Sequence, residues 1–390
     1  MNMSRDLHKS PFDEGTMTKL AVLRQYIRDW FPVFFKDQIH NWQKVEIYDF
    51  FAGEGFDTDG NAGSPIIFLE ELRVYCRTIK ERNLIVELLF NEYNKIKYLK
   101  LKKALDESII SCRISAFCPY KEPTDCPFTI KTEQRDFKEL LNELYPSMLE
   151  TTKTPRFMFL DQNGIKSVDR GIFSKLISLE RTDFLFFIAS SFANRFAELP
   201  EFQEYLTINR QDFQFTEPYH CHRVILNYYK NLIPSNKKYY LAPFSIKKPF
   251  TGNIYGLIFG SNHLRGLEKF LDTAWALDKN TGEANYNIDN DDIIKTGQFS
   301  LFQESNIVKK LALFQSLITE FIKIEPKTNV EIYQFTLESG FMPYHTREIL
   351  IELQNADRLK VNMVDGKEKV RKSSFYLKYN PEKLIRISHE

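Results

Sequence analysis

A short apolar run that ends in a cluster of glycines constrains the fold of this chain most strongly. The run from Val45 to Phe51 is rich in β-branched and aromatic residues, and four of the 15 glycines lie just after it, within IYDFFAGEGFDTDGNAGSP (47–65). Such a run is typical of a buried strand, and glycines end it abruptly. The sequence therefore predicts a strand that enters a tight turn, where the backbone can come close to a ligand.

Strand-like runs and helical patterns alternate along the first half of the chain. After the opening strand, IIFLEELRVYCRTIKE has helical spacing, and further strands are expected in LIVELLFNEYN, FTIKTEQRDF, PRFMFLDQNG and TDFLFFIASSF. Ahead of them, residues 12–35 form an amphipathic pattern, which predicts a helical arm that Pro32 ends or kinks. This order predicts an α/β fold: a parallel sheet with helices on both faces and a ligand at the carboxyl ends of the strands.

Carboxylates stand at the ends of the predicted strands. Asp49 and Glu54 flank the end of the first strand, Glu92 ends the second, Asp136 follows the third and Asp161 ends the fourth. Parallel strands bring their carboxyl ends to one edge, so we expect these acids to gather there. A carboxylate after the second strand can accept hydrogen bonds from both hydroxyls of a ribose. The alternative is that such acids cap the helices that follow.

The glycine spacing separates the candidate cofactors. A dinucleotide fingerprint needs G-x-G-x-x-G, but Gly53-Glu54-Gly55 has no third glycine at that spacing, and no G-x-x-x-x-G-K-[ST] sequence occurs. An acid-lined turn suits the cationic groups of S-adenosylmethionine better than it suits a pyrophosphate. We therefore predict S-adenosylmethionine as the cofactor, bound by Asp49, Phe51, Gly53, Glu54, Gly55, Glu92 and Asp136.

The last hundred residues have a different pattern. The polar stretch NTGEANYNIDNDD suits a linker, and it is followed by an amphipathic helix in NIVKKLALFQSLITEFIKI. A second predicted helix ends at Gly340, a third starts after Pro343, and a hairpin is expected to turn at Asp365-Gly366. Three helices and a hairpin predict a winged helix-turn-helix domain.

Positive charge gathers in this predicted wing, although the whole chain is close to neutral. Between residues 358 and 378 there are seven basic residues and two acids. The third helix also begins with Tyr344, His345, Thr346 and Arg347, where a recognition helix meets base edges. We predict DNA or RNA binding through Arg347, Lys367, Lys369, Arg371 and Lys372. The alternative is that the domain serves in dimerisation or protein docking.

Several of these stretches resemble the three-Cys-motif partner (TcmP) proteins. The resemblance is carried by YDFFAGEG with GNAGSP, GTMTKLAVLRQYI, FLDQNG, FFIASSFANRF and LIFGSNHLRGLEKFLDTAW, over roughly the first 275 residues. It implies a Rossmann-like class I methyltransferase fold and a partner protein with three cysteines that resembles radical S-adenosylmethionine enzymes. On this basis we expect a methyltransferase-like domain with its helical arm over residues 1–284, a linker over 285–304 and the winged-helix domain over 305–390.

The end of the fourth strand departs from the family pattern. Where the resemblance implies Asp-Pro-Phe-Gly, which is itself reminiscent of the motif that holds a target nitrogen in amino-methyltransferases, this chain has Asp161-Gln162-Asn163-Gly164. The stacking aromatic residue and the stiffening proline are both absent. Asp161 can still accept a hydrogen bond from an amino group, so Asp161 and Asn163 are the candidate catalytic residues.

Composition limits the remaining possibilities. There are 53 Lys and Arg residues against 52 Asp and Glu residues, so nucleic-acid affinity must come from a local patch. Five cysteines, no signal peptide and no membrane-spanning apolar run predict a reduced cytoplasmic protein. Cys112, Cys118 and Cys126 lack the spacing of zinc ligands, and His220 and His222 are two candidate ligands without partners, so no metal site is predicted.

The function predicted from the sequence is a nucleic-acid modifying protein of the methyltransferase type that depends on S-adenosylmethionine. Two alternatives stay open. One is a non-catalytic protein that binds nucleic acid or a partner and keeps a degenerate cofactor pocket. The other is a metal-dependent nuclease built from the strand-end acids, although no lysine or histidine accompanies them on the strand ends.

Overall fold

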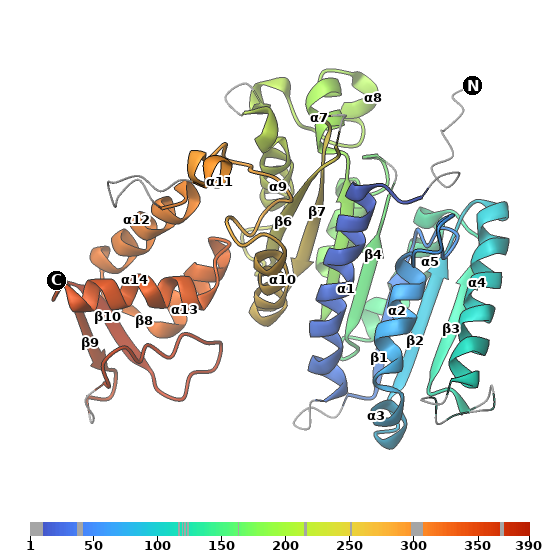
Figure 1. Ribbon diagram of the computed structural model, residues 1–390, viewed down its shortest axis with the longest axis horizontal. Helices are drawn as coiled ribbons and strands as arrows, with labels where there is room; N and C mark the ends of the chain where they lie inside the picture. Colours follow the sequence, from blue (N-terminus) through green and yellow to red (C-terminus); the bar gives the residue numbers. More distant parts are fainter. Residues whose placement is uncertain are drawn as a thin grey trace. The chain divides into compact units, whose positions relative to one another are not determined.

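The chain forms two compact units, residues 1–262 and 263–390. The computed structural model describes residues 11–36, 42–115, 118, 120, 122, 125–162, 164–213, 217–249, 252–297, 307–366 and 370–390. In Figure 1 the first unit runs from blue to olive and the second from olive to red. The predicted boundaries at residues 284 and 305 stay predictions.

The first unit is built on a seven-stranded sheet with the order β3-β2-β1-β4-β5-β7-β6. Its strands are β1 (Lys44–Asp49), β2 (Ile85–Asn91), β3 (Phe128–Glu133), β4 (Arg156–Leu160), β5 (Thr182–Ile188), β6 (Tyr240–Lys247) and β7 (Ile254–Ser261). The five strands expected from the sequence are present and pair in parallel, which confirms the α/β prediction. β7 pairs antiparallel with both β5 and β6. β6 was not expected from the sequence.

Helices cover both faces of this sheet. They are α1 (Glu14–Phe35), α2 (Ser64–Arg73), α3 (Cys76–Glu81), α4 (Lys95–Ile114), α5 (Phe137–Glu150), α6 (Arg170–Ser178), α7 (Ser190–Phe196), α8 (Pro200–Gln203) and α9 (Cys221–Asn231). Figure 1 shows α1 and α2 in front of the sheet. On β5, Phe187 faces Lys19 of α1, whereas the adjacent Phe186 packs on Tyr229 of α9. Alternate side chains of one strand therefore contact helices on opposite faces.

The helical arm predicted before the first strand is α1, and it packs on the sheet as an integral layer. The apolar residues at helical spacing are buried. Pro32 lies inside the helix, which continues to Phe35. Tyr26 and Trp30 also donate hydrogen bonds to the buried carboxylate of Asp183 on β5, at 2.8 and 3.0 Å. These polar contacts fix the position of α1 along the sheet.

The second unit contains the helix-turn-helix elements. Its helices are α10 (Leu264–Leu277), α11 (Asp292–Thr296), α12 (Lys309–Ile324), α13 (Asn329–Glu338) and α14 (Pro343–Asn355), and its strands are β8 (Lys327–Thr328), β9 (Leu359–Met363) and β10 (Ile385–His389). Thr328 and Glu331 form a capping box at the start of α13. Gly340 has a φ of 81° in the turn to α14, as a glycine after a helix commonly does.

The predicted hairpin around Asp365-Gly366 is wrong in its second strand. β9 pairs with β10, far along the chain, in an antiparallel arrangement. The chain between them is held elsewhere, because Asn329 donates hydrogen bonds to the carbonyls of Tyr376 and Lys383, and Phe375 is buried. Alternating apolar residues after Gly366 therefore pack as an irregular segment and not as a strand.

His220 and His222 do not share a strand face. His220 ends a short 3₁₀ helix, and His222 lies in α9 with its ring fully buried. The ring donates from Nε2 to the carbonyl of Leu257 at 2.9 Å, so Nδ1 accepts a hydrogen bond from the Ser190 hydroxyl at 2.8 Å. The ring lies directly over Gly256 of β7.

We expect Gly256→Ala to destabilise the first unit by about 1 to 3 kcal/mol, the usual cost of overpacking a core. An added Cβ would stand 2.2 Å from two atoms of the His222 ring, which is fixed by hydrogen bonds at both nitrogens. Chemical denaturation measures the loss. Gly171→Ala, at an exposed helical position, is the matched control and should cost much less, because its added Cβ would meet only one Asp169 oxygen, at 3.3 Å. Equal stability of the two variants would contradict the packing argument.

Candidate functional site

A cavity of about 1180 Å³ lies at the carboxyl edge of the sheet in the first unit. Its walls come from the start of α1, the glycine loop after β1, and the segments that follow β2, β4 and β5. Among the residues predicted to bind a cofactor or to act in catalysis, those that line it are Phe51, Gly53, Glu54, Gly55, Glu92, Asp136 and Asp161. Asn163 lies outside the described residues.

The glycine loop closes on itself and on α4. Gly53 and Gly55 have φ values of 67° and 91°, and the Gly63 amide donates to the Gly55 carbonyl at 2.7 Å. A Cβ on Gly55 would lie 2.7 Å from the Ala104 side chain, and one on Gly63 would lie 2.9 Å from the Gly55 oxygen. Packing within the loop and against α4 therefore requires glycine at positions 55 and 63. The sequence instead predicts that the glycines let the backbone approach a ligand.

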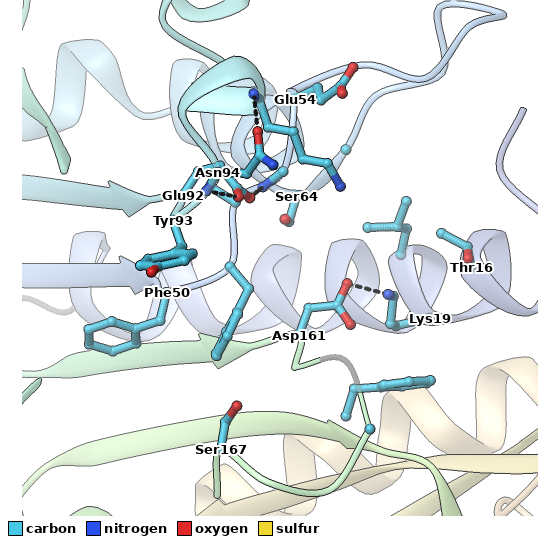
Figure 2. A pocket seen from close by; sticks show the side chains of 18 of the residues that line it. Thr16, Lys19, Phe50, Glu54, Ser64, Glu92, Tyr93, Asn94, Asp161 and Ser167 are labelled. Carbon is cyan, nitrogen blue, oxygen red and sulfur yellow. Dashed lines mark hydrogen bonds and ion pairs between the residues drawn. The ribbon is translucent and has the colours of Figure 1, made fainter. Parts of the chain in front are cut away.

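Glu92 is held at the cavity wall by backbone amides. The Gly53 amide donates to Oε2 at 3.1 Å, and the Asn94 amide donates to Oε1 at 2.8 Å. Figure 2 shows Glu92 between Tyr93, Asn94 and Ser64. Because each carboxylate oxygen has two lone pairs, both can accept one more hydrogen bond from a ligand. Tyr93 lies beside it with an exposed ring and also lines the cavity.

Asp49 is buried beneath this wall and lacks full hydrogen bonding. Its carboxylate accepts from the Phe51 amide at 3.2 Å and from the Ser64 hydroxyl, but Oδ2 has no hydrogen-bond partner among the described residues. Burial raises the pKa of Asp49 to about 7, and the charges of Asp161 and Glu92 act in the same direction. Asp49 does not itself line the cavity, so it is a buried acid behind the wall that a nearby cation would ionise.

Asp161 forms an ion pair with Lys19 of α1, as Figure 2 shows. The Lys19 side chain is only 9% exposed, and its ammonium lies 4.9 Å from the centre of the Phe187 ring. Sequence reasoning missed Lys19, because a lysine within an amphipathic helix ordinarily belongs to the solvated face. Glu54 is likewise paired, with Lys100 at 2.9 Å.

The loop after Asp161 is stiffened without the proline of the family pattern. The Gln162 side chain is buried, and its Oε1 accepts hydrogen bonds from the amides of Ser167 at 2.7 Å and Val168 at 3.1 Å.

Asp136 has a capping role as well as a place in the cavity wall, since it accepts from the amides of Lys138 and Glu139 at the start of α5. Asp136 is also exposed at the cavity wall, where a ligand can contact it.

The predicted nucleic-acid residues belong to the second unit. Arg347, Arg371 and Lys372 are exposed, and Lys367 and Lys369 lie outside the described residues. His345 and Thr346, at the start of α14, were expected to meet base edges. Both are buried and therefore not available to bases. Burial lowers the pKa of His345 to about 4, and its ring packs on Trp275 of α10 at 4.2 Å.

The described residues contain neither a metal cluster nor a membrane-spanning helix. No group of three or more His, Cys, Asp or Glu side chains in the described part of the chain is arranged to hold a metal ion. Within the same residues, no helix combines the length and the apolar character needed to cross a membrane.

Comparison with known families identifies the C-terminal domain. A family model described as a GMT-like winged helix-turn-helix (wHTH) domain matches residues 286–366. No curated protein matches the chain. The strand order, with β7 antiparallel, is that of class I methyltransferases, so the chain combines a Rossmann-like methyltransferase sheet with a C-terminal winged helix. This combination confirms the predicted fold class.

Solved structures similar to this chain are distant. Trm1 from Pyrococcus horikoshii with S-adenosyl-L-methionine is 11% identical, with a TM-score of 0.36, and the match covers 70% of this chain but only 63% of that protein. An O-methyltransferase from Bacillus cereus in complex with SAH is 12% identical over 64% of this chain and 91% of its own, with a TM-score of 0.30. A loganic acid methyltransferase with SAH is 8% identical over 64% and 79%, with a TM-score of 0.25.

We expect Asp49→Asn to change how stability depends on pH. Because the folded-state pKa of Asp49 is raised to about 7 from 3.8, the native protein keeps a proton that the unfolded chain releases, so this residue lowers stability as pH rises from about 4 to about 7. The free energy of unfolding of the variant should therefore rise relative to that of the parent over that range, by at most about 4 kcal/mol. Urea titrations at several pH values measure the difference. A difference that stays constant with pH would contradict the assignment.

Proposed function

We propose that this chain binds S-adenosylmethionine in the cavity and directs its methyl group to a nucleic acid. The observation that carries the proposal is Glu92, whose two carboxylate oxygens are oriented by the amides of Gly53 and Asn94 and can each accept one more hydrogen bond. A ribose presents two adjacent hydroxyls, which is the donor pair that such a carboxylate fits.

The residues around Glu92 suit the remainder of this cofactor. Tyr93 and Ile96 offer apolar surface at the cavity wall next to the ribose position. Asp49, with its orphaned Oδ2, would stabilise the cationic end, whereas Glu54 is already paired with Lys100. When bound, S-adenosylmethionine supplies an electrophilic methyl group on a sulfonium ion. No group of this chain needs to become covalently attached for that transfer.

The role of Asp161 is to orient the acceptor. Its carboxylate ends β4, lines the same cavity as Glu92, and can accept a hydrogen bond from an amino group of the acceptor. Lys19 holds the carboxylate from one side through its ion pair. This orientation would direct the nitrogen lone pair toward the methyl group of the sulfonium ion. The carboxylate would also stabilise the positive charge that develops on the nitrogen.

The pairing with Lys19 also favours a second candidate. A carboxylate that is already neutralised by a buried ammonium is a weaker partner for an amino group, as expected for a degenerate site that binds the cofactor without transfer. The two candidates differ in one measurable quantity, the methyl transfer that the parent chain catalyses.

We assign the winged helix to binding of nucleic acid and the whole chain to the three-Cys-motif partner group. The first assignment is supported by the exposed Arg347, Arg371 and Lys372 and by the match to a winged helix-turn-helix model. The second rests on the sequence stretches around the glycine loop and β4, and it carries with it a partner that resembles radical S-adenosylmethionine enzymes.

Calorimetric titration with S-adenosylmethionine or its demethylated product tests the cofactor site. The parent chain should bind, and Glu92→Ala should weaken binding by about 1 to 3 kcal/mol, since the ribose hydroxyls then lose a charged hydrogen-bond acceptor at the cavity wall. Glu92→Gln should weaken it less, because one acceptor oxygen remains. Glu107→Ala, on the exposed part of α4, is the matched control. No heat with the parent chain at millimolar ligand would remove the proposal.

Asp161→Asn tests transfer separately from binding. We expect it to abolish incorporation of tritiated methyl groups into bulk RNA or DNA while leaving the cofactor affinity nearly unchanged, because Asp161 acts on the acceptor. Equal loss of both would identify a cofactor or structural residue. Cofactor binding by the parent without any transfer would favour the degenerate site.

A further inference from the structure

We propose that the acceptor is a single-stranded nucleic acid held by a cation–aromatic rim, defined as Lys138, Lys166, Phe192, Arg195 and Tyr205. This inference rests on the proposed function and names the state of its substrate. It concerns the first unit alone, so it does not depend on the winged helix.

Tyr205 is the centre of the rim. The ammonium of Lys166 lies 5.2 Å from the centre of its ring, and that of Lys138 lies 5.8 Å away. Lys138 is compensated by an ion pair with Asp169. No carboxylate partner of Lys166 is found among the described residues, so this exposed ammonium keeps its charge for a ligand.

Phe192 and Arg195 form the second part of the rim, on α7. The Arg195 guanidinium lies 5.0 Å from the centre of the Phe192 ring, and its hydrogen bonds go to the Asn253 side chain and the Ser191 carbonyl. Both of these acceptors are neutral, so the positive charge is not cancelled. The Phe192 side chain is exposed and lines the mouth of the cavity.

The rim lies beside the proposed acceptor group. Lys166 follows Asp161 on the same loop, and Lys138, Lys166, Phe192 and Tyr205 all line the cavity. Two other lysines of the cavity wall are compensated, since Lys100 pairs with Glu54 and Lys248 pairs with Asp13. Unpaired positive charge therefore coincides with the half-buried ring of Tyr205 and the exposed ring of Phe192.

This combination matches the chemistry of an unpaired nucleotide. Aromatic rings stack on bases whose faces are open, while arginine and lysine contact the phosphates beside them. In a duplex the base faces are covered by neighbouring pairs, so the rings would have nothing to stack on. An acceptor base must also leave its stack to reach Asp161 inside the cavity.

Fluorescence anisotropy with the full chain tests the inference. The probes are labelled RNA and DNA strands of about 12 nucleotides, alone and as duplexes. Single strands should bind more tightly than duplexes. Tyr205→Ala should weaken binding of single strands about 5-fold or more, while Tyr205→Phe, which keeps the ring, should retain it. Thermal unfolding of both variants checks that the fold is intact.

Charge is tested by a matched pair of double variants. Lys166→Ala with Arg195→Ala should flatten the salt dependence of single-strand binding by about 1.4, at roughly 0.7 per phosphate contact. Lys103→Ala with Lys153→Ala removes two charges from exposed positions, on α4 and before β4, away from the cavity, and should leave the slope unchanged.

Each contrary result has its own meaning. The rim variants could bind strands like the parent while Arg371→Ala with Lys372→Ala loses binding. The winged helix would then bind the strand, and the inference would be overturned with the proposed function intact. If no strand binds even at about 50 mM salt, the rim suits a protein segment and the inference is also overturned. If the rim variants lose strand affinity but S-adenosylmethionine gives no heat, the proposed methyl transfer is overturned, whereas the rim is still the surface that binds single strands.

Discussion

The parallel pairing of β1 with β2 and β4 is the constraint on which the candidate site depends. It places Asp49, Glu92 and Asp161, which are far apart in sequence, at one edge of the sheet. The glycine loop then connects β1 to α2 across that edge and delivers the Gly53 amide to Glu92. An antiparallel arrangement of any of these strands would send its acid to the opposite edge.

Gathering acids at one edge has an electrostatic cost, and the structure offsets it with cations from other elements. Lys19 of α1 neutralises Asp161 and Lys100 of α4 neutralises Glu54. Asp49 receives no such partner among the described residues, so burial and its acidic neighbours raise its pKa to about 7. A cationic ligand at this edge would stabilise the ionised form of Asp49, which no cation of the described residues does.

The helix α1 shows how one element can serve both fold and site. Its apolar face packs on the sheet, and the buried carboxylate of Asp183 accepts from Tyr26 and Trp30. Those contacts fix the register of the helix and thereby place Lys19 at Asp161. The rim beside Asp161 differs, because its charges at Lys166 and Arg195 are left for a ligand. The cavity region thus combines acids that are neutralised by ion pairs with cations that are not.

The sequence by itself determined the five parallel strands, the glycine loop and the acids at the strand ends, because periodicity and turn chemistry are local properties. It could not determine that Lys19 would reach Asp161, that Gln162 would stiffen the loop after β4, or that Tyr205 would meet Lys166, since these contacts join residues placed by different elements. The wing shows the same limit: Asp365-Gly366 does form a turn, but β9 pairs with β10 because Asn329 and the buried Phe375 hold the intervening chain away from the sheet. Tertiary packing decides between partners that local patterns leave equal.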